Sequence, residues 1–85
     1  SRMYMSDKEQ LMKIREILQE VFPEDKIPDD IDDLKIGDLP SWDSLGNFNL
    51  ILAIETELQI RFSMEQIADV DSIKKVLEVI KDNNG

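Results

Sequence analysis

The stretch Trp42-Asp43-Ser44-Leu45-Gly46 ends a long acidic loop and begins the most apolar helical segment of the chain. Asp43 is a suitable N-cap residue, because its carboxylate can accept hydrogen bonds from the free backbone N–H groups of the first helical turn. Ser44 then takes the first helical position, where its hydroxyl faces water and an added phosphate would lie at the positive end of the helix dipole. Gly46 costs the helix about 1 kcal/mol relative to alanine, and it leaves room for a bulky group to approach Ser44. We expect Trp42 to pack over the helix start.

The helix that we expect over about 44–58 carries two apolar stripes. At about 100° per residue, one stripe consists of Leu50, Ile51, Ile54 and Leu58. The other lies about 140° away and consists of Leu45, Phe48 and Leu52. One small core cannot easily take both, so we expect the second stripe to stay partly exposed beside Ser44 and to serve as a docking surface, with Glu55 supplying charge at its edge. The alternative is a central helix that packs on two sides.

A capping box opens the first helix. Ser6-Asp7-Lys8-Glu9 places a capping serine three residues before a glutamate that reaches back to it, and apolar residues then recur at helical spacing until Pro23. These signals predict a helix over residues 7–21, followed by a loop over residues 23–43. A structureless loop of that length would be unusual in a compact domain. We therefore expect its apolar side chains to hold it against the core; they are Ile27, Ile31, Leu34, Ile36 and Leu39.

The C-terminal part of the chain predicts two more helices. Ser63-Met64-Glu65-Gln66 repeats the capping-box spacing before a short helix over about 64–68, in which Ile67 and Ala68 should face the core. A last helix follows over about 73–82. We therefore expect an all-α fold, a small antiparallel four-helix bundle with three main helices, one short helix and a long first loop.

The composition excludes several classes of function. The 85 residues include no cysteine and no histidine, so the domain has no disulfide and lacks both the commonest general base and the commonest metal ligand. We therefore do not expect an enzyme. The net charge of −9 argues against nucleic-acid binding and against anionic membranes, and it favours partners with basic surfaces. Residues 27–60 contain eight acidic side chains and one basic one, Lys35, so the region around Ser44 is the most negative part of the chain.

The acidic loop invites comparison with an EF-hand calcium site, but its spacing does not fit. If Asp30 and Asp32 take positions 1 and 3, positions 5 and 6 are Leu34 and Lys35, where the motif needs an oxygen ligand and a glycine. We therefore expect no specific metal site and disfavour a calcium sensor.

The ends of the chain suggest neither membrane insertion nor secretion. No stretch is long and apolar enough to form a transmembrane helix, and the N-terminus lacks the apolar core of a signal peptide, so we expect a cytoplasmic protein. Ser1-Arg2 before Met3 looks like a cloning remnant. We expect residues 1–5 to be disordered, a single domain over residues 6–82 and a frayed tail over residues 83–85.

Asp43-Ser44-Leu45-Gly46 at the start of an apolar helix, in an acidic chain of this length, resembles the acyl carrier protein family over roughly residues 6–82. In that family the serine of Asp-Ser-Leu carries a covalent 4′-phosphopantetheine group, and the following helix docks partner enzymes. The resemblance implies that Ser44 is the attachment site of 4′-phosphopantetheine from coenzyme A. It also implies that the protein carries acyl intermediates as thioesters in fatty-acid, polyketide or related biosynthesis. The docking residues would be Asp43, Leu45, Gly46, Phe48, Leu52 and Glu55.

The resemblance further implies a non-catalytic monomer. Its partners would be a phosphopantetheinyl transferase and acyl-loading and acyl-processing enzymes with basic docking surfaces. Gly46, Asn49 and Thr56 occupy positions that are often acidic in fatty-acid carriers, so a specialised carrier fits as well as a housekeeping one. The alternative from another functional class is an unmodified acidic adaptor, which would dock through helix 44–58 and need no cofactor.

Overall fold

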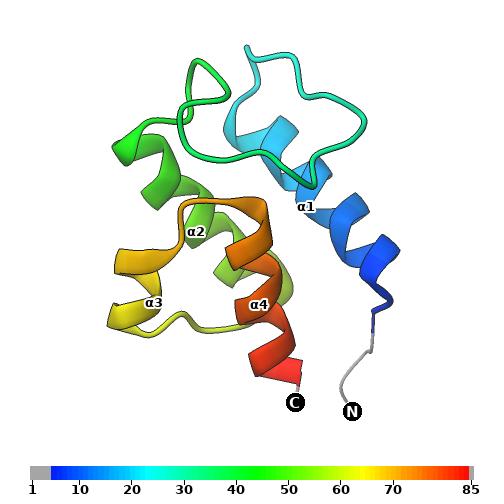
Figure 1. Cartoon of the computed structure of the whole chain (residues 1–85), viewed down its shortest axis with the longest axis vertical. Coiled ribbons are helices and arrows are strands. Elements are labelled where there is room, and N and C mark those ends of the chain that lie inside the picture. Colours follow the sequence, from blue (N-terminus) through cyan, green and yellow to red (C-terminus); the bar gives the residue numbers. More distant parts are fainter. Residues whose placement is uncertain (1–4, 85) are drawn as a thin grey trace.

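The computed structural model describes residues 5–84. This part of the chain forms four helices, α1 (Asp7–Val21), α2 (Ser44–Leu58), α3 (Met64–Asp69) and α4 (Ile73–Asn84) (Figure 1). The Cα radius of gyration is 12.0 Å, which matches the value of about 12 Å for a compact chain of this length. The expected all-α fold with one short helix and a long first loop is confirmed.

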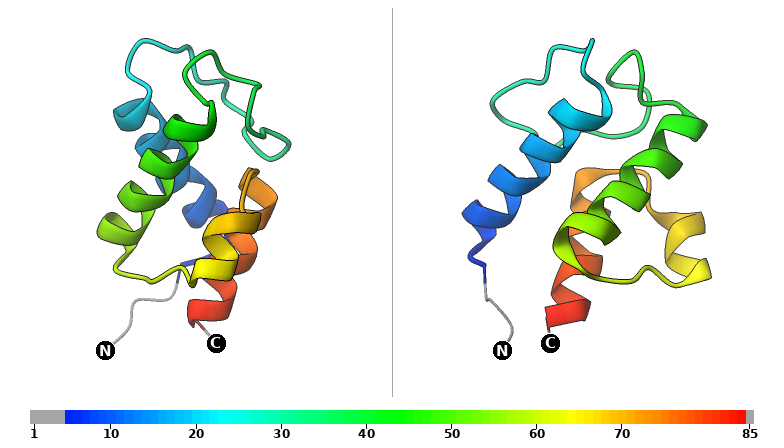
Figure 2. Two further views of the ribbon diagram at one scale, coloured as in Figure 1. Left: turned by 90° about the vertical axis from the view of Figure 1, so that its left-hand side faces the viewer. Right: turned by 180° about the vertical axis from the view of Figure 1, so that it is seen from behind.

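The helices alternate in direction along the chain (Figures 1 and 2). α1 packs directly against α2 and runs antiparallel to it, whereas α2 and α4 run in the same direction (Figures 1 and 2). The reason is the connection between α2 and α4, which returns to the other end of the molecule through the short α3. The long loop crosses the end of the molecule where α1 ends and α2 begins.

Local capping signals fix where α1 begins. The Ser6 side chain accepts from the Glu9 N–H at 3.2 Å, and the Glu9 carboxylate accepts from the Ser6 N–H at 2.9 Å, which confirms the predicted capping box. These two hydrogen bonds satisfy backbone donors that the helix itself leaves free. The hydrogen bond from the Ser6 backbone N–H, together with one from the Ser6 hydroxyl, lowers the pKa of the Glu9 carboxyl.

The long loop is pinned to the core, as its apolar spacing predicts. Three of the five expected side chains are buried and the other two, Leu34 and Ile36, are partly buried. The backbone of the same loop pairs with the connection between α3 and α4, because Ile36 N donates to the Asp71 carbonyl at 2.8 Å and Ile73 N donates to the Leu34 carbonyl at 3.0 Å. The loop is therefore an ordered part of the domain.

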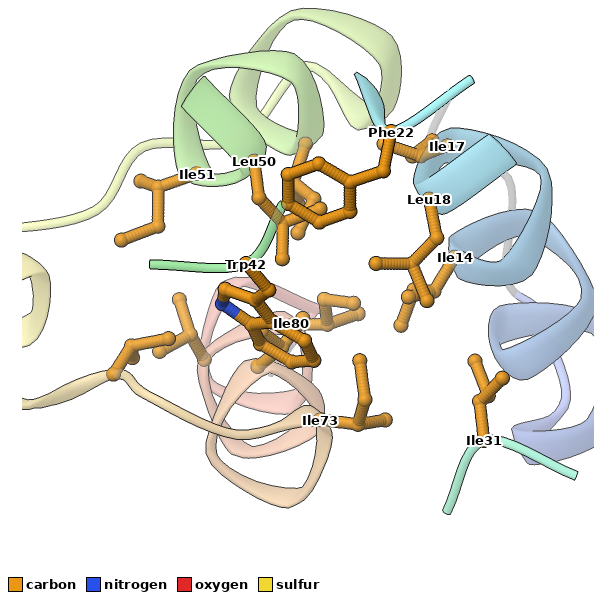
Figure 3. Close-up of a cluster of buried hydrophobic side chains, with 14 of the residues drawn as sticks. Ile14, Ile17, Leu18, Phe22, Ile31, Trp42, Leu50, Ile51, Ile73 and Ile80 are labelled. Carbon is orange, nitrogen blue, oxygen red and sulfur yellow. The ribbon is translucent and has the colours of Figure 1, made fainter. Parts of the chain in front are cut away.

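One core joins the loop to three helices. Its fully buried side chains come from α1, α2, α4 and the segment before α2, and Figure 3 shows Trp42 in the middle of the cluster. Trp42 is 1% exposed, and its ring stacks on that of Phe22 at a centroid distance of 6.3 Å. Trp42 thus packs over the start of α2, as expected, and it is also part of the core.

The last two helices differ from expectation in detail. α3 ends one residue later than predicted, and the expectation that Ala68 faces the core is wrong, because Ala68 is exposed. Neighbouring Phe62 and Val70 supply the buried contacts instead. α4 continues to Asn84, beyond the predicted end, and Asn83 donates to the Val79 carbonyl within it at 3.0 Å. Residues 1–4 of the predicted N-terminal tail and Gly85 lie outside the described residues.

Candidate functional site

The site is built on the first turn of α2. Asp43 caps the helix as predicted, because its carboxylate accepts from the Gly46 N–H at 2.8 Å and its carbonyl accepts from the Asn47 N–H at 2.7 Å. Ser44 is exposed at the first helical position. Its hydroxyl therefore stands at the positive end of a 15-residue helix. The negatively charged carboxylate of Asp43 already lies at the same helix end, where it is hydrogen-bonded to the Gly46 N–H.

Gly46 serves a different purpose from the one expected. It is buried, and a Cβ atom there would overlap the Ser41 carbonyl oxygen and approach Phe22 Cε1 to 3.0 Å. The space left by its missing side chain is thus filled by the loop, so the interpretation that Gly46 opens room beside Ser44 is wrong. Asp25 holds Ser41 in place by accepting from its N–H at 2.8 Å and its hydroxyl at 2.9 Å.

Asn47 links three segments around the site. Its Oδ1 accepts from Trp42 Nε1 at 2.9 Å, and its Nδ2 donates to the Val70 carbonyl at 2.8 Å, directly after α3. Our sequence interpretation gave Asn47 no role. A signal was present, because at about 100° per residue Asn47 falls within the core-facing stripe of α2. A polar side chain in that stripe needs hydrogen-bond partners inside the fold.

The second apolar stripe of α2 is exposed, as predicted. The exposed fraction is 69% for Leu45, 47% for Phe48 and 44% for Leu52. We call these three residues the exposed face of α2. It lies next to Ser44, so an apolar surface and an accessible hydroxyl occur together. An apolar surface with charged surroundings is typical of a protein-docking site.

Glu55 is engaged with the backbone. It is half-buried, and its Oε2 accepts from the Phe62 N–H at 2.8 Å. Glu55, which we expected to supply charge at the edge of the docking surface, therefore also holds the segment before α3 through a hydrogen bond. Sequence spacing placed Glu55 on the correct side of α2, but it could not show this long-range partner.

Several carboxylates of the acidic loop make contacts within the domain. Asp29 pairs with Arg15 at 3.3 Å and Asp33 with Lys74 at 3.2 Å. Hydrogen bonds from the Lys35 backbone and side chain lower the pKa of Asp38. Within residues 5–84, no group of three or more acidic side chains is arranged to hold a metal ion.

No family model, curated protein or solved structure matches this chain. None of the helices in residues 5–84 has the length and apolar character required to cross a membrane.

Proposed function

We propose that this protein is an acyl carrier whose Ser44 accepts 4′-phosphopantetheine. The observation that carries the proposal is the exposed Ser44 hydroxyl at the start of α2, directly beside the exposed face formed by Leu45, Phe48 and Leu52. A transferase needs both an accessible hydroxyl and a surface to grip. The Asp-Ser-Leu resemblance to acyl carrier proteins points to the same serine.

The residues around Ser44 fit the attached group. The phosphodiester would lie at the positive end of α2, where anions are favoured. The Asp43 carboxylate, which is held by the Gly46 N–H, would repel the phosphodiester and direct it away from Asp43 toward solvent. When bound, the group would supply a thiol that holds acyl chains as thioesters. The chain has no thiol of its own, since it contains no cysteine.

The modification requires a separate enzyme. A serine hydroxyl is a weak nucleophile unless a base activates it, and the chain has no histidine to act as that base. The partner would therefore bring the base and coenzyme A. With a net charge of −9 on the carrier, a basic surface around the partner's active site would speed their encounter.

A second candidate function rests on the same exposed face. An unmodified adaptor could bury Leu45, Phe48 and Leu52 against a partner without using Ser44. The two functions differ in one respect, because substitution of Ser44 would abolish carrier activity and leave adaptor binding intact.

The test is the intact mass after incubation with coenzyme A and a broad-specificity phosphopantetheinyl transferase. We expect the wild-type protein to gain one phosphopantetheine and Ser44→Ala to gain none. Ser41→Ala is the matched control, since Ser41 is an exposed serine three residues away, and it should be modified like the wild type. An unchanged wild-type mass with an active transferase would reject the carrier and leave the adaptor.

A further inference from the structure

α3 has one side chain packed against the core, the partly buried Ile67, and its other anchors lie at its ends. None of residues 64–69 is buried, and Met64 is 85% exposed. The buried side chains next to the helix are Phe62 before it and Val70 after it. A helix of six residues is too short to be stable alone in water. Its position therefore depends on the contact of Ile67 with the core and on what binds the two flanking segments.

Two side chains of α2 bind these segments. Asn47 Nδ2 donates to the Val70 carbonyl at 2.8 Å, and Glu55 Oε2 accepts from the Phe62 N–H at 2.8 Å. The spacing is matched, because eight residues separate the two α2 side chains (55 − 47) and eight separate their partners (70 − 62). The early α2 residue binds the later partner, so the segment containing α3 lies antiparallel to α2.

α4 also contacts this segment, through weaker bonds. Lys75 Nζ donates to the Asp69 carbonyl at 3.3 Å, and Asn83 Nδ2 donates to the Arg61 carbonyl at 3.3 Å. Both bonds are exposed and longer, whereas the two bonds from α2 are partly buried. A shielded bond at the shorter distance constrains the backbone more strongly. The two α2 side chains therefore make the principal polar tethers of this segment.

The tethers place α3 at the border of the exposed face of α2. At about 100° per residue, Ser44, Phe48 and Glu55 fall within about 40° of one another on α2. The segment that Glu55 binds thus lies beside the stripe that begins at Ser44. α3 adds its own exposed side chains to this border, including Met64 and Glu65.

We infer that Asn47 and Glu55 are positioning residues that fix α3 beside Ser44. The modifying enzyme would then bind a surface in which α2 and α3 have one fixed relative position. The clause on the enzyme rests on the proposed carrier function, whereas the positioning of α3 does not. Both parts follow from two hydrogen bonds that join separate segments, and each part has its own measurement.

Amide hydrogen exchange of residues 64–69 tests the positioning. Asn47→Asp keeps an acceptor for Trp42 Nε1 but replaces the donor to the Val70 carbonyl with a carboxylate, and a negative charge near the start of α2 is compatible with the helix dipole. We expect exchange in α3 to accelerate about tenfold, the factor that corresponds to one lost hydrogen bond, with α1 unchanged. Asn49→Asp, the same charge change on the exposed side of α2, should leave exchange at the wild-type rate.

Glu55→Ala gives a second, independent measurement, because it removes the tether at the other end of α3. It should accelerate exchange at Phe62 and in α3. If α3 exchanges at the wild-type rate in both Asn47→Asp and Glu55→Ala, the positioning role is overturned, whatever the protein's function.

The kinetics of phosphopantetheine transfer test the clause of the proposal that concerns docking of the modifying enzyme on α2 and α3. With a phosphopantetheinyl transferase, Asn47→Asp should show a several-fold higher KM and an unchanged kcat, since it disturbs docking and leaves Ser44 intact. Asn49→Asp should show no rise in KM. Faster exchange with an unchanged KM would overturn this clause alone. A wild-type protein that is never modified would overturn it together with the carrier function, while the exchange data would still decide the positioning.

Discussion

The two faces of α2 carry the same kinds of side chain in opposite surroundings. Leu50 and Ile54 are 0% exposed, whereas Leu45 is 69% and Leu52 is 44% exposed. Both faces belong to one regular helix with one cap. Composition therefore does not decide which leucine is buried; the position of α1 and of the loop segment containing Trp42 does.

The difference separates the side chains that stabilise the fold from those that the proposed function would use. The buried face supplies the contacts that stabilise the domain, while the apolar area on the exposed face contributes little to folding. That area remains available, and burying it against a partner would be favourable by roughly 25 cal/mol per Å². Substitutions on the two faces should therefore have different consequences, and each of the following measurements probes that difference.

The largest effect is expected from a pair of identical substitutions. Leu50→Ala should lower the free energy of unfolding by about 2–5 kcal/mol, because it leaves a cavity in the core. Leu52→Ala, two residues away on the exposed face, should change it by about 0.5 kcal/mol or less. Urea denaturation followed by circular dichroism measures both. Equal losses would show that the exposed face also holds the fold together.

Gly46→Ala tests how closely the loop lies on the buried side of the first turn. Because the new Cβ would overlap the Ser41 carbonyl oxygen, we expect a loss of about 1–3 kcal/mol in the free energy of unfolding. Helix propensity alone predicts the opposite sign, a gain of about 1 kcal/mol. A stabilised variant in urea denaturation would therefore refute the close packing between the loop and α2.

Asp43→Ala removes the cap on which both faces depend. The lost hydrogen bond to the Gly46 N–H should cost about 1 kcal/mol. Asp43→Asn retains an acceptor and should remain close to wild-type stability. Thermal unfolding of the two variants at neutral pH would measure the difference, and equal melting temperatures would contradict the capping role.

The smallest effect concerns the border between α1 and the buried side of α2. The hydrogen bond and the negative charge of Glu57 raise the pKa of the Glu20 carboxyl. A carboxyl with a raised pKa stabilises the fold at low pH, and this contribution is lost as the pH rises through that pKa. Glu20→Gln should therefore raise the melting temperature slightly at pH 7, relative to wild type, and bring no such gain at pH 4. A gain that is the same at both pH values would contradict the coupling.

The sequence was sufficient to predict the features that depend on neighbouring residues. Capping by Ser6, Asp43 and Ser63 and the stop at Pro23 gave helix bounds that match the structure closely. Periodicity also predicted that α2 has one buried and one exposed stripe, because side-chain direction in a helix is set by the backbone alone.

Features that depend on distant residues could not be predicted in this way. The hydrogen bonds of Asn47 to Trp42 and to Val70 join three segments. The residues near Asn47 in the sequence do not indicate that the segment containing Val70 lies next to it. Gly46 was misinterpreted for the same reason, since the carbonyl that fills its space belongs to the preceding loop. The one available sign was that Asn47, a polar residue, falls in the core-facing stripe of α2.

The most direct test of the account is the rate of phosphopantetheine transfer to wild-type protein and to Phe48→Ala, followed by intact mass. Phe48 belongs to the exposed face and lies one helical turn from Ser44. We predict that the wild type gains one phosphopantetheine on Ser44. Phe48→Ala should react about tenfold more slowly with an unchanged melting temperature. A wild type that stays unmodified, or two proteins that react at the same rate, would contradict the claim that this face and Ser44 form one recognition site.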